Sequence, residues 1–115
     1  ELMLASTRRG GWEGASLRAA SDAAVTITLA SAGYPESSSK GDVISGLDSV
    51  PAGVEITHAG TALNGAGEVV TAGGRVLNVT ALGATVAEAR AAAYAAAEKI
   101  TFDGRQMRSD IAAGI

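Results

Sequence analysis

The sequence predicts an α+β domain in which a small antiparallel sheet is covered by one main helix. Three observations support this class. Residues 23–31, "AAVTITLAS", alternate apolar and polar side chains with the period of a half-buried strand. Residues 64–67, "NGAG", are typical of a tight hairpin turn. After Thr85 the apolar period changes to 3.6 residues, which predicts a helix over about residues 85–99.

The remaining elements follow in chain order. Residues 1–22 predict a short helix and a glycine-containing loop, and "SAGYPESSSKGD" at 31–42 predicts a long surface loop. Two short strands are expected in "DVISGL" at 42–47 and "VEITHAG" at 54–60. "GEVVTA" and "GRVLNVTALG" are expected to pair as neighbours or near neighbours in an antiparallel sheet. The second of these runs is apolar on both faces, which favours a central strand.

The predicted helix carries a capping box and a stripe of small residues. Thr85 precedes the helix and Glu88 follows three residues later, so each side chain is expected to bond the other's free backbone donor. The stripe should pack closely against the sheet; it comprises Val86, Ala89, Ala93, Ala96, Ala97 and Ile100. We expect short strand or irregular structure beyond the helix.

Composition excludes several classes of function. The formal net charge is −3 and the basic residues are scattered, which argues against nucleic-acid binding. No apolar stretch approaches the roughly 20 residues that cross a bilayer. The chain has no cysteine and one histidine, so a thiolate nucleophile and a zinc cluster are excluded. These features fit a soluble protein of the cytoplasm.

The strongest candidate for binding is "GGR" at 73–75. Gly73 and Gly74 let the backbone approach a ligand, and the planar fork of Arg75 suits a carboxylate or phosphate. A turn with an internal ion pair is an equally good interpretation. The partners for that pair would be Asp42, Asp103 or Asp110.

Other polar residues give weaker signals. His58 is the only histidine, and a structural hydrogen bond explains it better than a catalytic base. "SSSKGD" resembles a phosphate-binding loop in composition, but it lacks the required spacing of glycines and lysine. Arg105, Arg108 and Asp110 favour a local charged network over a clamp on a partner domain.

Six ordered blocks give a more specific signal: "ASAGYP", "KGDVISGL", "HAGTAL", "VVTAGGRVLNVTALG", "TVAEARAAAYAAAEKI" and "FDGRQMRSDI". Together they resemble, from about Leu2 to Ile111, the C-terminal domain of the phosphoribosylamine–glycine ligases of the ATP-grasp superfamily. The resemblance implies a barrel-sandwich module with a flanking helix, residues 23–115, that closes the active site. Residues 1–22 would be a helix and linker continuing from an ATP-grasp body, so we expect the chain to be a fragment.

The resemblance also implies a reaction. In these enzymes ATP phosphorylates glycine, and 5-phosphoribosylamine attacks the glycyl phosphate to give glycinamide ribonucleotide, the second step of purine synthesis. ATP and Mg²⁺ or Mn²⁺ would be held by the other domains of the same polypeptide, and the full-length enzyme would be a cytoplasmic monomer. The fragment would be inactive alone and would bind neither nucleic acid nor membrane. Residues expected to hold the phosphoribosyl group are Gly73, Gly74 and Arg75, with Lys40, Gly41, Tyr34 and His58 as weaker candidates.

Three positions depart from the pattern of these ligases. Glu36 and Ala112 stand where glycine is usual, and Ser38 replaces a frequent aromatic residue. Two other kinds of protein remain open. A carrier module would need an exposed lysine at a hairpin tip, and Lys40 lacks that context. A purely structural interaction domain would be favoured if Arg75 were buried in an ion pair.

Overall fold

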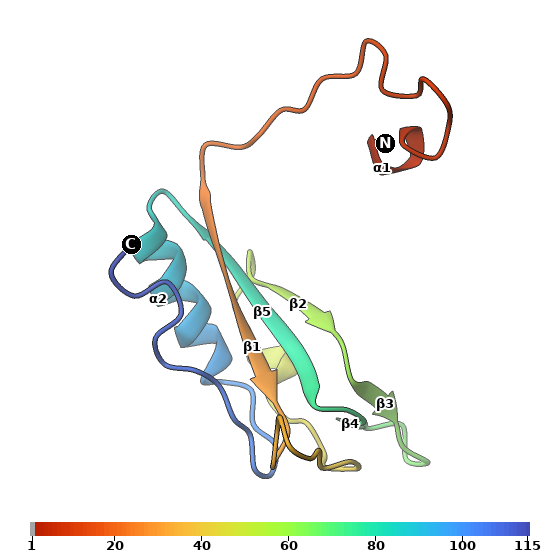
Figure 1. Cartoon of the computed structure of the whole chain (residues 1–115). Coiled ribbons are helices and arrows are strands. Elements are labelled where there is room, and N and C mark those ends of the chain that lie inside the picture. Colours follow the sequence, from red (N-terminus) through yellow and green to blue (C-terminus); the bar gives the residue numbers. More distant parts are fainter. Residues whose placement is uncertain (1) are drawn as a thin grey trace.

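The computed structural model describes residues 2–115 and confirms the α+β class (Figure 1). Five strands, two α-helices and one 3₁₀ helix follow one another along the chain. In order they are α1 (Leu2–Ala5), β1 (Ala23–Ala30), η1 (Leu47–Ser49), β2 (Glu55–His58), β3 (Thr61–Leu63), β4 (Val69–Thr71), β5 (Arg75–Gly83) and α2 (Val86–Ala97).

The main sheet is antiparallel, with the strand order β1-β5-β2. The central position predicted for "GRVLNVTALG" is therefore confirmed. Leu77, Val79 and Ala81 of β5 are buried on one face, opposite Leu29, Ile27 and Val25 of β1. The sequence predicted that the other face of β5 would also be apolar. That face is instead polar, since Asn78 and Thr80 lie on it.

A register shift interrupts the pairing of β1 with β5 at one end. Leu29 pairs with Leu77, whereas Ala30 pairs with Arg75, so Val76 is an extra residue in β5. Such a bulge breaks the strict two-residue alternation of side chains along a strand. Val76 and Leu77 are consequently both fully buried, while Arg75 is exposed on the opposite face from Leu77.

The predicted helix forms and covers the apolar face of this sheet (Figure 1). The Oγ1 atom of Thr85 accepts the backbone N–H of Glu88 at 3.2 Å, which is one half of the predicted capping box. Because alanine has a short side chain, the helix can lie close to the strands. The predicted stripe is confirmed by five fully buried residues: Ala89, Ala93, Ala96, Ala97 and Ile100; Val86 packs at its edge.

The predicted hairpin also forms, but it lies in a second sheet. Its turn joins β3 to β4, and the side chain of Asn64 accepts the backbone N–H groups of Ala66 and Glu68. The expected pairing of "GEVVTA" with "GRVLNVTALG" is wrong, because β4 pairs with β3 and not with β5. The chain turns from the first sheet into the second at Gly60, and we call this place the corner. The amide of Gly60 donates to the carbonyl of Arg75, and its carbonyl accepts the amide of Ala72.

"DVISGL" does not form the expected strand. Val43 and Ser45 make only isolated bridges, to Val70 and Thr101, and η1 begins at Leu47. A positive φ of 87° at Gly46, where an added Cβ would lie 1.8 Å from the carbonyl oxygen of Lys99, ends the extended run. Within residues 2–115 the two small sheets remain separate and do not form a closed barrel.

The segment after α2 is irregular and is fastened to the helix. Arg105 donates to the carbonyls of Ala97 and Ile100 at 2.6 and 2.7 Å and pairs with Glu98 at 3.1 Å, which caps the helix C-terminus. Arg108 pairs separately with Asp110. The predicted local network is confirmed for Arg108 with Asp110, whereas Arg105 pairs with Glu98 instead.

The N-terminal region extends away from the sheets in Figure 1. A short helix, α1, and several turns are followed by an extended stretch that reaches β1, as predicted for this region. Glu1, at which the predicted helix begins, lies outside the described residues. Among residues 2–115 no helix is both long enough and apolar enough to span a bilayer.

Candidate functional site

A hollow of about 500 Å³ lies where the polar face of the main sheet meets the loop after β1 and the segment after α2. It combines hydroxyl, guanidinium and apolar side chains from four parts of the chain. Its lining residues are Thr26, Thr28, Ala30, Tyr34, Pro35, Arg75, Gln106, Met107, Arg108 and Ile111.

Arg75 reaches this hollow because of the bulge at Val76. The bulge pairs Arg75 with Ala30, which shares the polar face of β1 with Thr26 and Thr28. The Arg75 side chain is exposed, and neither ion pair of the described residues includes it. The alternative of an internal pair with Asp42, Asp103 or Asp110 is thus not realised.

The two glycines before Arg75 pack against the protein itself. A Cβ on Gly74 would lie 2.6 Å from Cδ2 of Tyr34, and a Cβ on Gly73 would lie 3.3 Å from the Cα of Gly60. The carbonyl of Gly74 accepts the amide of Ser31 at 2.8 Å. In this structure the absence of side chains at 73 and 74 therefore lets Tyr34 and the corner at Gly60 come close to the start of β5.

Hydrogen-bonded polar side chains extend from the hollow across the sheet. The hydroxyls of Thr26 and Thr80 lie 2.8 Å apart, and Thr28 donates to Oδ1 of Asn78 at 3.0 Å. The amide of Asn78 reaches Thr57 of β2 at 3.4 Å. Since each Thr hydroxyl keeps further donor or acceptor capacity, this row can also bond the hydroxyls of a ligand.

The hollow brings together only two of the seven predicted site residues, Tyr34 and Arg75. Gly73 and Gly74 lie directly before Arg75. His58 ends β2 and its Nδ1 lies 2.9 Å from the Thr61 hydroxyl, which fits a structural hydrogen bond. Lys40 is exposed, and the amide of Gly41 bonds the carbonyl of Thr71 at 2.7 Å. None of the three residues Lys40, Gly41 and His58 lines the hollow.

The loop that carries Lys40 and Gly41 is anchored by the next residue, Asp42. Hydrogen bonds from the hydroxyls of Ser39 and Thr71 lower the pKa of Asp42 below its ordinary value of 3.8. The buried Thr71 hydroxyl donates to Oδ2 of Asp42 at 3.0 Å. Asp42 therefore acts as a structural acceptor that ties the loop to the end of β4.

Sequence reasoning missed the residues that the C-terminal segment contributes to the hollow. Gln106 forms a bridge with Ala30, and its side chain bonds the carbonyl of Ser31 at 3.2 Å. Met107 and Arg108 follow directly and line the hollow. The order "RQMR" carries no period or motif, so only the pairing with β1 reveals this placement.

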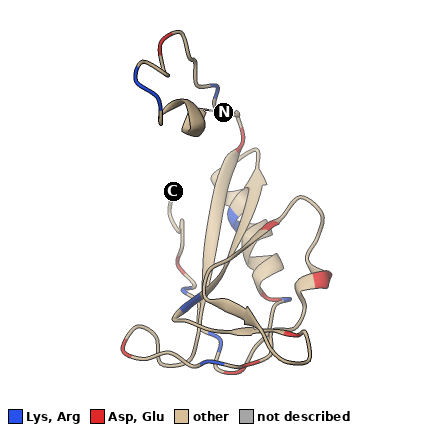
Figure 2. Cartoon of the chain, turned by 90° about the vertical axis from the view of Figure 1, so that its right-hand side faces the viewer, with Lys and Arg blue, Asp and Glu red and all other residues tan. Residues whose placement is uncertain are grey.

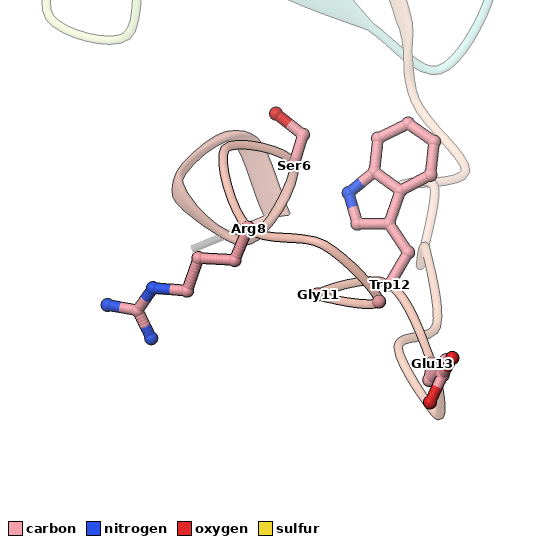
Figure 3. Close-up of a pocket in the computed structure, with 6 residues that line it drawn as sticks. Ser6, Arg8, Gly11, Trp12 and Glu13 are labelled. Carbon is pink, nitrogen blue, oxygen red and sulfur yellow. The ribbon is translucent and has the colours of Figure 1, made fainter.

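The N-terminal region forms a second, smaller hollow of about 400 Å³. Figure 3 shows that Arg8, Trp12 and Glu13 point away from one another, so no set of polar groups converges on a ligand there. All of its lining residues come from one short stretch: Ser6, Arg8, Gly10, Gly11, Trp12 and Glu13.

Charged residues of both signs are distributed mainly over the loops, whereas the strands and α2 are largely uncharged (Figure 2). Among residues 2–115 no three potential metal ligands of the His, Cys, Asp or Glu type lie together. The lining of the hollow at Arg75 includes two guanidinium groups, which suit an anion, and no His, Cys, Asp or Glu side chain.

Comparison with known proteins identifies the family. Residues 24–114 match the profile of the family described as phosphoribosylglycinamide synthetase, C domain. The chain belongs to this family. The match covers every strand of the main sheet almost completely, the hairpin, α2 and the C-terminal segment, and so includes all the residues of the hollow.

Relatives at high identity support the assignment to the phosphoribosylglycinamide synthetase C-domain family. The phosphoribosylamine–glycine ligase of Neisseria meningitidis (strain Z2491) is 50% identical over 89 residues, which are 77% of this chain and 21% of that protein. The ligase of Streptomyces coelicolor is 50% identical over 100 residues, 84% of this chain and 24% of that protein.

A solved structure of a family member gives the same result. The crystal structure of phosphoribosylamine–glycine ligase from Thermotoga maritima superposes with a TM-score of 0.74 at 38% identity, over 89% of this chain and 25% of that one. The fold and the resemblance drawn from the six blocks are confirmed. The chain spans between a fifth and a quarter of the length of these relatives.

Proposed function

We propose that this chain is the part of a phosphoribosylamine–glycine ligase that closes over the substrate, and that its hollow at Arg75 receives the phosphate of the phosphoribosyl group. The observation that supports this most directly is an exposed guanidinium that has no ion-pair partner among residues 2–115 and lines a hollow that also presents hydroxyl groups. A guanidinium donates two parallel hydrogen bonds to phosphate, and Thr26 and Thr28 offer hydroxyls for the ribose.

The proposed reaction joins glycine to 5-phosphoribosylamine. The terminal phosphoryl group of ATP passes to the carboxylate of glycine and leaves ADP. The amine of phosphoribosylamine then attacks the carbonyl carbon, the C–N bond forms, and phosphate departs with the bonding electrons of the C–O bond. The residues of this chain hold the phosphoribosyl end of the nucleophile, so that its amine meets the acyl phosphate in a fixed orientation.

The remaining domains of the same polypeptide would hold ATP and Mg²⁺ or Mn²⁺. On this proposal residues 1–22 connect those domains to the domain formed by residues 23–115, and the isolated chain is inactive. The full-length protein would be a cytoplasmic monomer that binds glycine and phosphoribosylamine but neither nucleic acid nor membrane. Lys40, Gly41 and His58 remain weaker predictions, since they would have to reach the substrate from outside the hollow.

A carrier module is the alternative from a different functional class, and the geometry does not favour it. A carrier lysine lies at the tip of a tight hairpin. In this chain the hairpin tip between β3 and β4 is formed by residues 64–68, which contain no lysine. Lys40 lies instead in an irregular loop whose end is tied to Thr71.

Replacing Arg75→Gln in the full-length ligase tests the proposal. A hydrogen bond to a charged group contributes about 1.5–3 kcal/mol, so we expect the KM for phosphoribosylamine to rise by roughly 10- to 150-fold. The KM for ATP should be nearly unchanged, since ATP binds elsewhere. Steady-state kinetics with each substrate varied in turn measures both constants.

The exposed Arg18→Gln variant is a matched control, because it removes the same charge from the extended region before β1, away from the hollow. It should behave as the wild type. Unchanged KM and kcat for phosphoribosylamine in Arg75→Gln would refute the proposed role of the hollow.

A further inference from the structure

The hollow at Arg75 contains a second cationic side chain, Arg108. A phosphate monoester has a second pKa near 6 and carries about −1.5 to −2 charges at pH 7. Arg75 alone would leave much of that charge without a partner. Arg108 lies in the segment that follows α2, which bridges to β1 through Gln106 on the other side from Arg75, and its side chain is 73% exposed.

The contact of Arg108 with Asp110 leaves donors available. Nε of Arg108 donates to Oδ1 of Asp110 at 2.8 Å, and Nη2 donates to Oδ2. A guanidinium has five N–H donors, so this paired contact uses two and leaves three for a ligand. The carboxylate of Asp110 also fixes the plane of the guanidinium, which lowers the entropy that Arg108 would lose on binding an anion.

The wall that carries Arg108 is held by two side chains of α2. The hydroxyl of Tyr94 donates to the carbonyl of Arg108 at 2.7 Å and accepts the amide of Ile111 at 3.1 Å. Arg90 donates to the carbonyls of Ser109 and Ile111, both at 2.8 Å.

These two anchors also stabilise each other. The guanidinium of Arg90 lies 4.8 Å from the centre of the Tyr94 ring, a cation–π distance. α2 is packed on the sheet that carries Arg75. The hydrogen bonds of Tyr94 and Arg90 therefore fix the segment that carries Arg108 relative to that sheet. Four hydrogen bonds thus join two side chains of α2 to the backbone of this irregular segment.

We propose that Arg108 is a second phosphate-binding residue of this hollow, and that Tyr94 and Arg90 are positioning residues that hold it opposite Arg75. The inference rests on the proposed function, since it deepens the role of the same hollow. The competing interpretation is an exposed ion pair of Arg108 with Asp110 that only shapes the turn, and such pairs contribute little to stability.

Binding of ribose 5-phosphate to the full-length ligase, measured by calorimetry, tests this inference. At pH 7.5 we expect Arg108→Gln to weaken binding about tenfold and Arg18→Gln to have no effect. At pH 5.5, where the phosphate is mostly a monoanion, the loss in Arg108→Gln should shrink to about threefold or less. A purely structural role for Arg108 would give a loss that does not depend on the charge of the phosphate.

Tyr94→Phe tests the anchoring, because it keeps the ring and removes both hydrogen bonds of the hydroxyl. We expect it to weaken ribose 5-phosphate binding about threefold without a change in the KM for ATP. Wild-type binding in Tyr94→Phe would overturn the positioning role, and wild-type binding in Arg108→Gln would overturn the second site.

The outcome for Arg75→Gln in the same assay separates the two proposals. If Arg75→Gln is impaired and Arg108→Gln is not, the proposed function stands and this inference fails. If neither variant is impaired, the proposed function itself fails. A thermal melt of each variant, expected within about 4 °C of the wild type, verifies that the altered proteins are folded.

Discussion

The two faces of the β1-β5-β2 sheet differ in almost every physical property. The face under α2 is formed by fully buried aliphatic side chains such as Ile27, Leu29 and Leu77. The opposite face carries hydroxyl and amide side chains, among them Thr26, Thr28 and Asn78, which bond one another and remain partly open to water.

This difference separates stability from recognition within one strand. Alternate residues of β1 contribute to the core or to the hollow, so neighbouring positions have unrelated tasks. Burial of aliphatic area stabilises the domain on one side. On the other side, hydrogen bonds that contribute little to folding join the polar groups that we propose contact the substrate. Substitutions on the two faces should therefore have different consequences.

The largest effect is expected for Ile27→Ala. Ile27 is fully buried beneath α2, and truncation of such a residue leaves a cavity that costs about 2–5 kcal/mol. The adjacent Thr28→Ala should cost less than about 1 kcal/mol, because its hydroxyl is only partly buried. Urea unfolding of both variants measures the difference. Equal losses in the free energy of unfolding would contradict the expected difference between the two faces.

A smaller effect is expected for Gly60→Ala. A Cβ at this position would lie 2.7 Å from the carbonyl oxygen of Arg75 and 2.8 Å from the Cα of Gly73. Because these neighbours are backbone atoms, the corner must shift, and overpacking of this kind costs about 1–3 kcal/mol. Gly65→Ala is the control, since no atom lies within 4 Å of its added Cβ. Chemical denaturation that ranks Gly65→Ala as the more damaging variant would contradict this account of the corner.

The smallest effect is expected on the polar face, for Thr26→Val. The hydroxyls of Thr26 and Thr80 bond each other in an exposed pair, so its loss should change the free energy of unfolding by less than about 1 kcal/mol. The double variant Thr26→Val with Thr80→Val should be close to neutral, because neither hydroxyl is then left without its partner. A double-mutant cycle by urea unfolding tests this, and a coupling well above 1 kcal/mol would show that the polar face also stabilises the fold.

The sequence predicted those features that depend on short-range pattern. The alternation in β1, the turn at residues 64–67 and the alanine stripe of α2 each follow from local spacing. The sequence did not predict the features that depend on contacts between residues far apart in the chain. Pairing of β4 with β3 follows from the corner at Gly60, and the exclusion of "DVISGL" from the sheet follows from the contact of Gly46 with Lys99.

The same distinction between local pattern and long-range contacts applies to the candidate site. Arg75 and Tyr34 belong to segments that looked unusual on their own, because glycines or proline adjoin a charged or aromatic residue. Arg108 and Gln106 join them only because Gln106 bridges to Ala30 of β1, a contact over 76 positions that no local pattern encodes. The reason given for Gly74 was also incomplete, since that position accommodates the ring of Tyr34.

Val76 has no partner residue in β1, and it shifts the alternation of side chains along β5 by one residue. If β5 paired with β1 in strict alternation through Val76, Arg75 would share the face of Leu77 and turn its guanidinium towards the alanine helix, where the cost of desolvation is high. Deleting Val76 would instead make Arg75 the direct neighbour of Leu77, so alternation alone would keep the guanidinium on the polar face while one fully buried aliphatic side chain was lost.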